Sequence, residues 1–223
     1  MEVNPNGYDD APPIGRLHVL TDFNLQQTYS HAELAHRAIE GGADVIQFRQ
    51  KKGGIRNKLV AAQATQAACS DTDVALLIND HVDIAQAVGA DGVHLGQTDF
   101  PIAEARAVLG AGPCIGATAR SPEQALSAYE AGASYIGFGP VYPTQSKYDT
   151  AAKPKGLELL AQTCEAVPLP VIAIAGITPE RVASVLEAGA HGVAVLSAVA
   201  LADAPEAATA ELRDALDHAV PNG

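Results

Sequence analysis

Polar residues alternate along one side of a short segment near the start of the chain, residues 47–51 (QFRQK). Successive side chains of an extended strand point to opposite sides, so Gln47, Arg49 and Lys51 share one side. The guanidinium of Arg49 can bind two phosphate oxygens at once, and the ammonium of Lys51 adds a point charge. A surface loop explains Lys52 better than Arg49, because Arg49 is embedded in an apolar run. The pattern predicts an anion site for a phosphorylated small molecule.

Two aspartates follow the next two apolar segments. Asn79 and Asp80 close one segment, and Asp99 comes shortly after the next. A single aspartate after a strand is often a helix N-cap, and that alternative applies to each one taken alone. Two carboxylates beside an anion site, however, are the oxygen ligands with which Mg²⁺ binds waters and substrate phosphates. We therefore expect one Mg²⁺ per active site, held by Asp80 and Asp99.

A loop rich in Gly and Pro, residues 139–147 (GPVYPTQSK), follows a later apolar segment. Its composition predicts an ordered, non-helical loop that is long enough to lie over a site. Thr144 and Ser146 supply hydroxyl groups and Lys147 supplies a cation. These three residues are candidates for substrate binding.

No nucleophilic triad is visible in the sequence. Ser121 and Ser197 lack an evident histidine and acid partner, and His94 lies inside an apolar run. A histidine in that setting is more often a hydrogen-bonded core residue than a base. A reaction that relies on a metal ion and anion binding, without a protein nucleophile, fits these residues better.

The elements that must position these residues are eight short apolar segments, each followed by an Ala-rich amphipathic stretch. Near-continuous hydrophobic blocks of this kind are typical of parallel strands buried on both faces. The expected strands are Leu17–Asp22, Asp44–Gln50, Ala75–Asp80, Gly92–Gly96, Cys114–Ala119, Tyr135–Val141, Val171–Gly176 and Gly192–Val199. Eight such units in about 200 residues predict an α/β fold, a single-domain (β/α)8 TIM barrel. A doubly wound open sheet is the alternative, and the lack of a GxGxxG turn after the first segment weakens it.

An internal repeat supports the barrel. The triplets at 42–44, 89–91, 132–134 and 189–191 (GAD, GAD, GAS and GAH) each stand between a helix-like stretch and an apolar segment. The glycine suits a left-handed helix end, and the alanine fits a tight turn into the next strand. The recurrence ahead of every second strand is expected when a pair of βα units is repeated.

A second anion site is expected at the ends of the last two strands. Barrel enzymes place their active sites at the C-terminal ends of the strands, with a frequent phosphate site after strands seven and eight. Gly176 closes one of these strands, and Leu196 and Ser197 close the other. Backbone N–H groups and a helix N-terminus can bind an anion there, and a glycine permits close approach. Two anion sites imply substrates with two phosphorylated ends.

Composition bounds the class of protein. The net charge of −12 and the pI near 4.8 argue against nucleic acid or an anionic membrane as a partner. No apolar run approaches the roughly 18 residues of a membrane helix. Residues 1–13 are polar, acidic and Pro-containing, without the features of a signal peptide, so we expect a flexible N-terminal arm followed by one catalytic domain over residues 14–223.

The cysteines indicate a reducing compartment. Cys69, Cys114 and Cys164 are scattered, odd in number and without metal-ligand spacing. Free buried thiols in a cytoplasmic enzyme are the expected state. The sequence does not reveal the oligomeric state, and a homo-oligomer stays open.

At these positions the chain resembles the thiamine-phosphate synthase family, in register from about residue 17 to the C-terminus. The matching blocks are 47–51 (QFRQK), 78–83 (INDHVD), 89–99 (GADGVHLGQTD), 137–147 (GFGPVYPTQSK) and 175–178 (AGIT). The resemblance implies that hydroxymethylpyrimidine diphosphate alkylates the nitrogen of a thiazole phosphate, giving thiamine phosphate and diphosphate. It also implies a dissociative reaction, in which diphosphate leaves before the pyrimidine-methyl cation is trapped.

The resemblance assigns roles to individual residues. It implies Mg²⁺ on Asp80 and Asp99, and diphosphate on Arg49, Lys51, Asn79, Thr118 and Lys147, of which Arg49, Lys51, Thr118 and Lys147 are the expected catalytic residues. It further implies that Gln47, Thr144 and Ser146 line the pyrimidine and thiazole region, and that the thiazole phosphate lies on the backbone at Gly176, Leu196 and Ser197.

Three positions depart from the family pattern. Arg120 stands where the family often has His, and Gln50 replaces a Glu. The pair Ala175-Gly176 stands where the family usually has Gly-Gly, so Ala175 replaces the first glycine. A related thiazole tautomerase is the first alternative, but it is expected to need His at the Arg120 position and to lose the Asp99-type ligand. A non-catalytic regulatory barrel is the second alternative, and it would not require the pair of aspartates.

Overall fold

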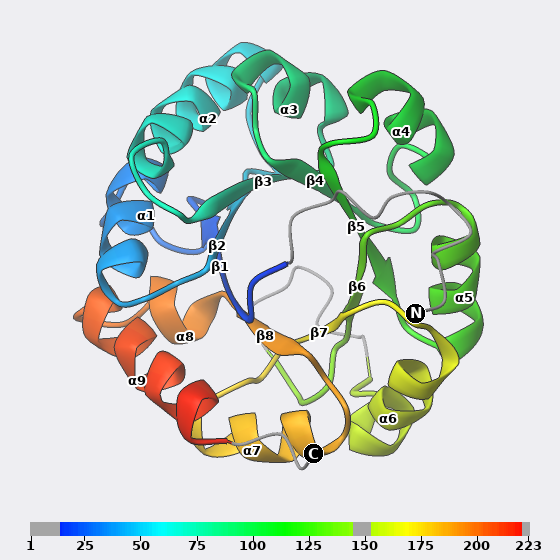
Figure 1. Cartoon of the computed structure of the whole chain (residues 1–223). Coiled ribbons are helices and arrows are strands. Elements are labelled where there is room, and N and C mark those ends of the chain that lie inside the picture. The colour runs from blue at the N-terminus through cyan, green and yellow to red at the C-terminus, as the bar shows by residue number, and fades with distance from the viewer. Residues whose placement is uncertain (1–13, 145–152, 220–223) are drawn as a thin grey trace.

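Eight parallel strands close into a barrel in the order β1 to β8 along the chain, and helices surround them (Figure 1). This computed structural model describes residues 14–144 and 153–219, so the expected N-terminal arm, 1–13, lies outside the described residues. The predicted (β/α)8 barrel is confirmed. Within the described residues no helix is both long enough and apolar enough to span a bilayer.

Strands and helices alternate along the described chain until β8, which is followed by two helices. The strands are β1 (Leu17–Asp22), β2 (Val45–Arg49), β3 (Ala75–Asn79), β4 (Gly92–Leu95), β5 (Cys114–Ala119), β6 (Tyr135–Phe138), β7 (Val171–Ile174) and β8 (Gly192–Val195). The helices are α1 (His31–Glu40), α2 (Ile55–Cys69), α3 (Val82–Val88), α4 (Ile102–Leu109), α5 (Pro122–Glu130), α6 (Gly156–Ala166), α7 (Pro179–Glu187), α8 (Ser197–Ala200) and α9 (Pro205–His218).

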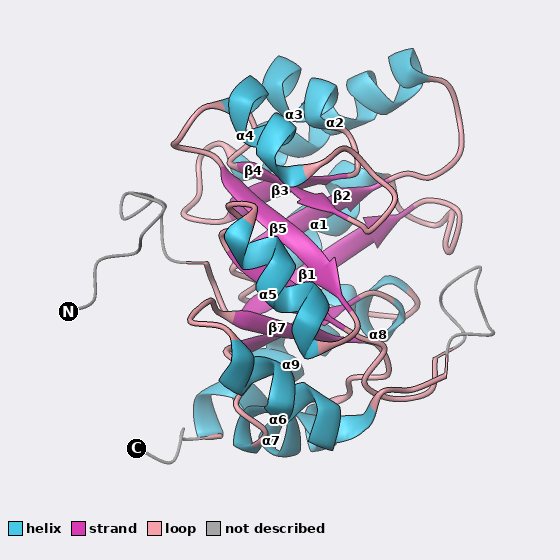
Figure 2. Ribbon diagram, turned by 90° about the vertical axis from the view of Figure 1, so that its right-hand side faces the viewer, coloured by secondary structure: helices cyan, strands magenta, loops and turns pink. Residues whose placement is uncertain are grey.

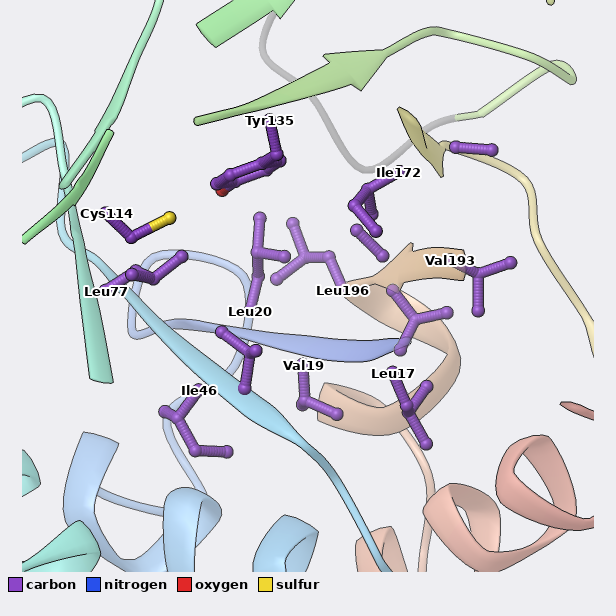
Figure 3. Close-up of a cluster of buried hydrophobic side chains, with 14 of the residues drawn as sticks. Leu17, Val19, Leu20, Ile46, Leu77, Cys114, Tyr135, Ile172, Val193 and Leu196 are labelled. Atoms are coloured by element: carbon purple, nitrogen blue, oxygen red, sulfur yellow. The ribbon is translucent and has the colours of Figure 1, made fainter. Parts of the chain in front are cut away.

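Side chains on the strands alternate between two apolar layers. Leu17 and Val19 of β1 lie on the side of the helices, whereas Leu20 lies on the same side as Tyr135, inside the barrel (Figure 3). All four are almost fully buried. Burial of both faces explains why the strands read as continuous apolar runs rather than as alternating ones.

Three predicted strands were too long by two or more residues at their C-terminal ends. β6 ends at Phe138 rather than Val141, and β7 ends at Ile174 rather than Gly176. Proline lacks the N–H that a ladder needs, so Pro140 ends the regular part of β6. β8 ends at Val195, because the apolar run that follows forms the short helix α8. An apolar run of this length does not distinguish a strand from a buried helix.

The helix start signals operate as the sequence indicates. Ser30 and Glu33 form a capping box at the start of α1, and the Ser121 side chain accepts a hydrogen bond from the Gln124 N–H at the start of α5. Each bond satisfies an N–H group that would otherwise lack a partner in the first turn. Thr178 precedes α7 without a side-chain cap, but Pro179 occupies the first helical position.

The repeated triplets fix where strands begin. Their glycines adopt positive φ angles of 88°, 66°, 95° and 94°, which favours glycine at these four positions. The residue that ends each of the first three triplets accepts a hydrogen bond from the backbone at the start of the preceding odd strand. The bonds are Asp44 Oδ2 from Leu17 N (2.8 Å), Asp91 Oδ2 from Leu76 N (2.8 Å) and Ser134 Oγ from Ile115 N (3.1 Å). The repeat therefore ties strands together in pairs at the base of the barrel.

The three cysteines are free thiols, as expected. Cys69 and Cys114 are buried and Cys164 is partly buried. Burial raises the pKa of each thiol to about 11. The thiolate is the reactive form, so these residues are inert packing groups near neutral pH.

Candidate active site

The predicted site residues that the structure describes lie on the C-terminal parts of the strands or in the segments that follow them. The strand arrows point toward the right-hand side of Figure 2, where the loops that follow the strands lie. This end is the C-terminal mouth, the usual place of the active site in this fold.

A cavity of about 510 Å³ opens at the mouth between the ends of β1, β2, β7 and β8. Five of the predicted substrate-binding residues line it: Arg49, Thr144, Gly176, Leu196 and Ser197. The remaining wall is largely apolar, with Leu20, Ile174 and Val195 among its side chains. The cavity can therefore enclose an apolar ring and place an anionic group against backbone at β7 and β8.

A smaller cavity of about 60 Å³ lies deeper in the barrel. Its lining includes four predicted residues: Gln47, Arg49, Asn79 and Thr118. Arg49 lines both cavities, so one guanidinium borders both the inner and the outer space.

Arg49 is held by an ion pair that the sequence did not reveal. Its Nη1 donates to the Asp22 carboxylate, and the two residues are register partners on β1 and β2. Both side chains are buried, and Asp22 also accepts a hydrogen bond from Asn24 N at 2.8 Å. A buried guanidinium fixed in this way has one orientation toward the cavities, which is the requirement for binding an anion by its fork.

The rim at β3 and β4 contains Lys51, Asp80 and Asp99. The Lys51 ammonium donates to the Asp80 carboxylate, and Asp99 Oδ2 accepts a hydrogen bond from Gly96 N at 2.7 Å. Burial raises the pKa of Asp99, and the neighbouring Asp80 carboxyl raises it further. The predicted pair of carboxylates is therefore adjacent, although neither residue lines the two cavities above.

Two non-glycine residues at the mouth have positive φ angles. Asp80 has φ of 68° and Ala175 has φ of 84°. Such a conformation costs on the order of 1 kcal/mol or more and is concentrated at functional sites. At Gly176, φ is 68°, and a Cβ atom would lie 2.6 Å from Tyr142 Cβ and 2.7 Å from the Pro143 carbonyl oxygen. Gly176 is therefore required by the packing of the β6 loop as well as by any bound anion.

A hydrogen-bonded chain inside the barrel ends at Thr118. The Tyr135 hydroxyl lies 2.8 Å from His94 Nδ1, and His94 Nε2 lies 2.9 Å from Thr118 Oγ1. Burial raises the pKa of Tyr135, so this residue keeps its proton. His94 is hydrogen-bonded through both ring nitrogens, as its interpretation as a core residue expects, but it is only partly buried and lines the smaller cavity. Its place is available because residues 116 and 137 are glycines, where a Cβ atom would meet Tyr135 at 2.2 Å or His94 at 2.7 Å.

No sequence pattern predicted two further contacts at the mouth. Lys58 of α2 is buried, and its Nζ lies 2.9 Å from His81 Nε2, next to Asp80. Gln97 Nε2 donates to the Thr118 carbonyl oxygen at 2.5 Å and so links the loop after β4 to β5. Each contact holds a loop that carries a predicted site residue against a neighbouring element, the loop after β3 against α2 and the loop after β4 against β5. The only signals in the sequence were a lysine and an amide side chain close to the predicted strand ends.

The remaining predictions are placed as follows. Ser146 and Lys147 lie outside the described residues. Arg120 is exposed at the end of β5 and lines neither cavity, and its backbone N–H donates to Gln124 Oε1 at 2.8 Å. Ala175 lines the larger cavity, so its methyl group adjoins the expected phosphate position.

The residues at the rim fit the expected Mg²⁺ in part. Asp80 and Asp99 are hard oxygen donors that lie close enough for one to raise the pKa of the other. Among residues 14–144 and 153–219 there is no group of three or more His, Cys, Asp or Glu side chains that could hold a metal ion. A divalent cation here would need waters and substrate phosphates to complete its coordination, as Mg²⁺ commonly does.

Comparison with known proteins gives the same assignment along the whole barrel. The family model described as thiamine monophosphate synthase matches residues 17–199. A thiamine-phosphate synthase from Salinibacter ruber is 66% identical over 204 residues, which are 92% of this chain and 89% of that protein. One from Methanocella arvoryzae is 45% identical over 197 residues, 88% of this chain and 92% of that protein.

A solved structure agrees with the sequence relatives. A thiamine phosphate pyrophosphorylase from Pyrococcus furiosus superposes with a TM-score of 0.83 at 37% identity, covering 92% of this chain and 96% of that chain. The matched relatives are transferases, and the fold is shared over nearly the full length of both chains. The chain thus belongs to the thiamine monophosphate synthase family of transferases.

Proposed function

We propose that this chain couples hydroxymethylpyrimidine diphosphate to a thiazole phosphate in a Mg²⁺-dependent reaction. The bond between the pyrimidine methylene carbon and the diphosphate oxygen breaks, and a bond from the thiazole nitrogen to that carbon forms. The products are thiamine phosphate and diphosphate. The observation that carries the proposal is the division of the mouth into a charged rim at β2–β4 and a mostly apolar cavity at β7–β8.

The charged rim suits the diphosphate. Arg49 offers fixed N–H donors, and Lys51 offers an ammonium group that already lies against Asp80. Thr118 offers a hydroxyl whose oxygen is already hydrogen-bonded to His94. The proposed binding set also includes Asn79 and Lys147. Preorganised charges of this kind stabilise the negative charge that develops on a leaving group.

The larger cavity suits the thiazole phosphate. Its apolar wall can hold the ring, and the backbone at Gly176 and Ser197 adjoins the space for the phosphate. Gln47 and Thr144 would contact the pyrimidine and thiazole between the two regions, together with Ser146. Holding the two substrates face to face replaces an encounter in solution and lowers the entropic part of the barrier.

A dissociative reaction is proposed because the described residues provide charge stabilisation and positioning, and no nucleophile is needed. Asp80 and Asp99 would hold the Mg²⁺. When bound, the ion would neutralise charge on the departing diphosphate. The chain's own residues bind the diphosphate, orient the thiazole nitrogen and exclude water from the methylene carbon.

The test is formation of thiamine phosphate from the two substrates, with Mg²⁺ and with EDTA. Product that requires Mg²⁺ supports both the coupling reaction and its metal dependence. Product in the presence of EDTA would remove the metal assignment and leave the coupling reaction. No product from correctly folded protein would refute the proposal. The next assay would then be tautomerisation of a thiazole carboxylate phosphate. Against that activity stands Arg120, which occupies the position where a tautomerase is expected to have His, and which is exposed and lines neither cavity.

A further inference from the structure

Arg181 is a charged residue in the wall of the larger cavity. It occupies the first turn of α7, directly after the β7 loop, and lines the cavity together with Gly176 and Ser197. Its side chain is partly buried. The position places a guanidinium beside the backbone at which the proposed thiazole phosphate would bind.

Two contacts fix the orientation of this guanidinium. Arg181 Nη1 donates to the Gly176 carbonyl oxygen at 2.5 Å, and the guanidinium carbon lies 4.5 Å from the centre of the Tyr142 ring. Stacking uses the flat face of the group, and the bond to Gly176 uses one of its five N–H donors. N–H donors at the edge of the group therefore stay available, in a side chain that is already ordered.

Arg181 supplies positive charge to a cavity that has few other cationic side chains. Of the described residues that line it, only Arg49 and Arg181 are positively charged, and Arg49 is paired with the buried Asp22. The protein as a whole carries a net charge of −12, which opposes the approach of a phosphate. A positive side chain in the first turn of a helix is also unfavourable by itself, because the helix N-terminus is positive. A phosphate bound between the Arg181 guanidinium and the N-terminus of α7 would offset the positive charge of each.

We propose that Arg181 binds the phosphate group of the thiazole substrate directly and is a substrate-binding residue of this enzyme. The inference rests on the proposed function and extends it by one residue. The guanidinium supplies charge-assisted hydrogen bonds where the rest of the site offers backbone N–H groups. Its contacts with Tyr142 and Gly176 keep it in the position that the phosphate requires.

The test compares a thiazole phosphate with its dephosphorylated alcohol, each titrated into the protein by calorimetry. Arg181→Met should weaken binding of the phosphate by roughly 10- to 100-fold, the range for loss of a charge-assisted hydrogen bond. Binding of the alcohol should change by less than about twofold, because no phosphate contact is lost. Arg181→Lys, which keeps the charge and loses the planar fork, should recover part of the affinity. In turnover, the KM for the thiazole phosphate should rise while that for the pyrimidine diphosphate stays constant.

Arg37→Met is the matched control, since it removes one positive charge from α1, outside the cavity. Equal loss of affinity for phosphate and alcohol in Arg181→Met would show that Arg181 only orders the loops, and would overturn the inference. Unchanged affinity of Arg181→Met for the thiazole phosphate would overturn the inference as well. If the wild-type protein still formed thiamine phosphate, the proposed function would stand. A wild-type protein that neither binds thiazole phosphate nor forms product would overturn both.

Discussion

His18 makes the stability of the barrel sensitive to acid. The side chain is fully buried inside the barrel, where Nε2 bonds to the Gly15 carbonyl oxygen at 3.0 Å and Nδ1 has no hydrogen-bond partner among the described residues. Burial lowers its pKa from 6.5 to about 4. The unfolded chain therefore takes up a proton at a pH where the folded chain does not. The contribution of His18 to stability is present above pH 6.5 and is lost as the pH falls toward 4.

The size of the effect follows from proton linkage. With these two pKa values, His18 lowers the free energy of unfolding by about 2 kcal/mol between pH 7 and pH 5, and by about 3 kcal/mol below pH 4. Urea denaturation at pH 7 and pH 5 measures the difference. The loss on going to pH 5 should be smaller in His18→Gln than in wild type by about 2 kcal/mol.

Other groups cancel in this comparison. His31, whose pKa burial also lowers to about 4, is present in wild type and variant alike. His36→Gln, at an exposed position on α1, is the matched control and should lose as much stability as wild type. An equal loss in wild type and His18→Gln would refute the reasoning, because it would mean that His18 becomes protonated inside the folded barrel.

Three further substitutions test the site and its support. Asp99→Asn removes one of two adjacent carboxylates, so Mg²⁺-dependent turnover should fall by roughly 100-fold or more, while the melting temperature is not lowered. Glu104→Gln, on the exposed side of α4, is the control. Equal turnover in the two variants would contradict the role of Asp99. Gly116→Ala places a methyl group 2.2 Å from the Tyr135 ring and should lower the free energy of unfolding by about 1–3 kcal/mol in urea denaturation; wild-type stability would show that the ring can move aside. Ala175→Gly relieves a positive φ and should raise stability by up to about 1 kcal/mol, and a less stable variant would mean that the backbone there is unstrained.

Much of the fold could be predicted because its signals are local. β1 and β5 have the predicted bounds, Leu17–Asp22 and Cys114–Ala119, since each is a buried apolar run between polar turns. The capping box at Ser30 depends on residues three apart in the sequence, and it forms as expected. The ends of β6, β7 and β8 were predicted less well, because hydrophobicity continues beyond the last ladder bond.

The sequence indicates which residue types lie at the mouth, but it does not indicate which side chains contact one another there. The position of Arg49, Asp80 and Asp99 at the mouth could be predicted because polar residues at the ends of apolar strands lie there. The bond from Arg49 to Asp22 depends on the register between β1 and β2, which the sequence does not state. Arg181 was missed for a related reason, since a charged residue in a first helical turn usually faces solvent. Arg181 is held against the cavity by its contact with the ring of Tyr142 in the loop after β6.

The hydrogen bonds made by the repeated triplets have a consequence for inheritance. The bonds that Asp44, Asp91 and Ser134 accept from Leu17, Leu76 and Ile115 each join the two strands of one pair, so a duplicated or exchanged gene segment that encodes such a pair would retain these bonds. The mouth is different, because the bond from Lys51 to Asp80 and the contact from His94 to Tyr135 cross between pairs. Recombination of two-strand segments would therefore preserve the side-chain bonds of the triplets, whereas these two contacts at the mouth need residues from different pairs to be inherited together.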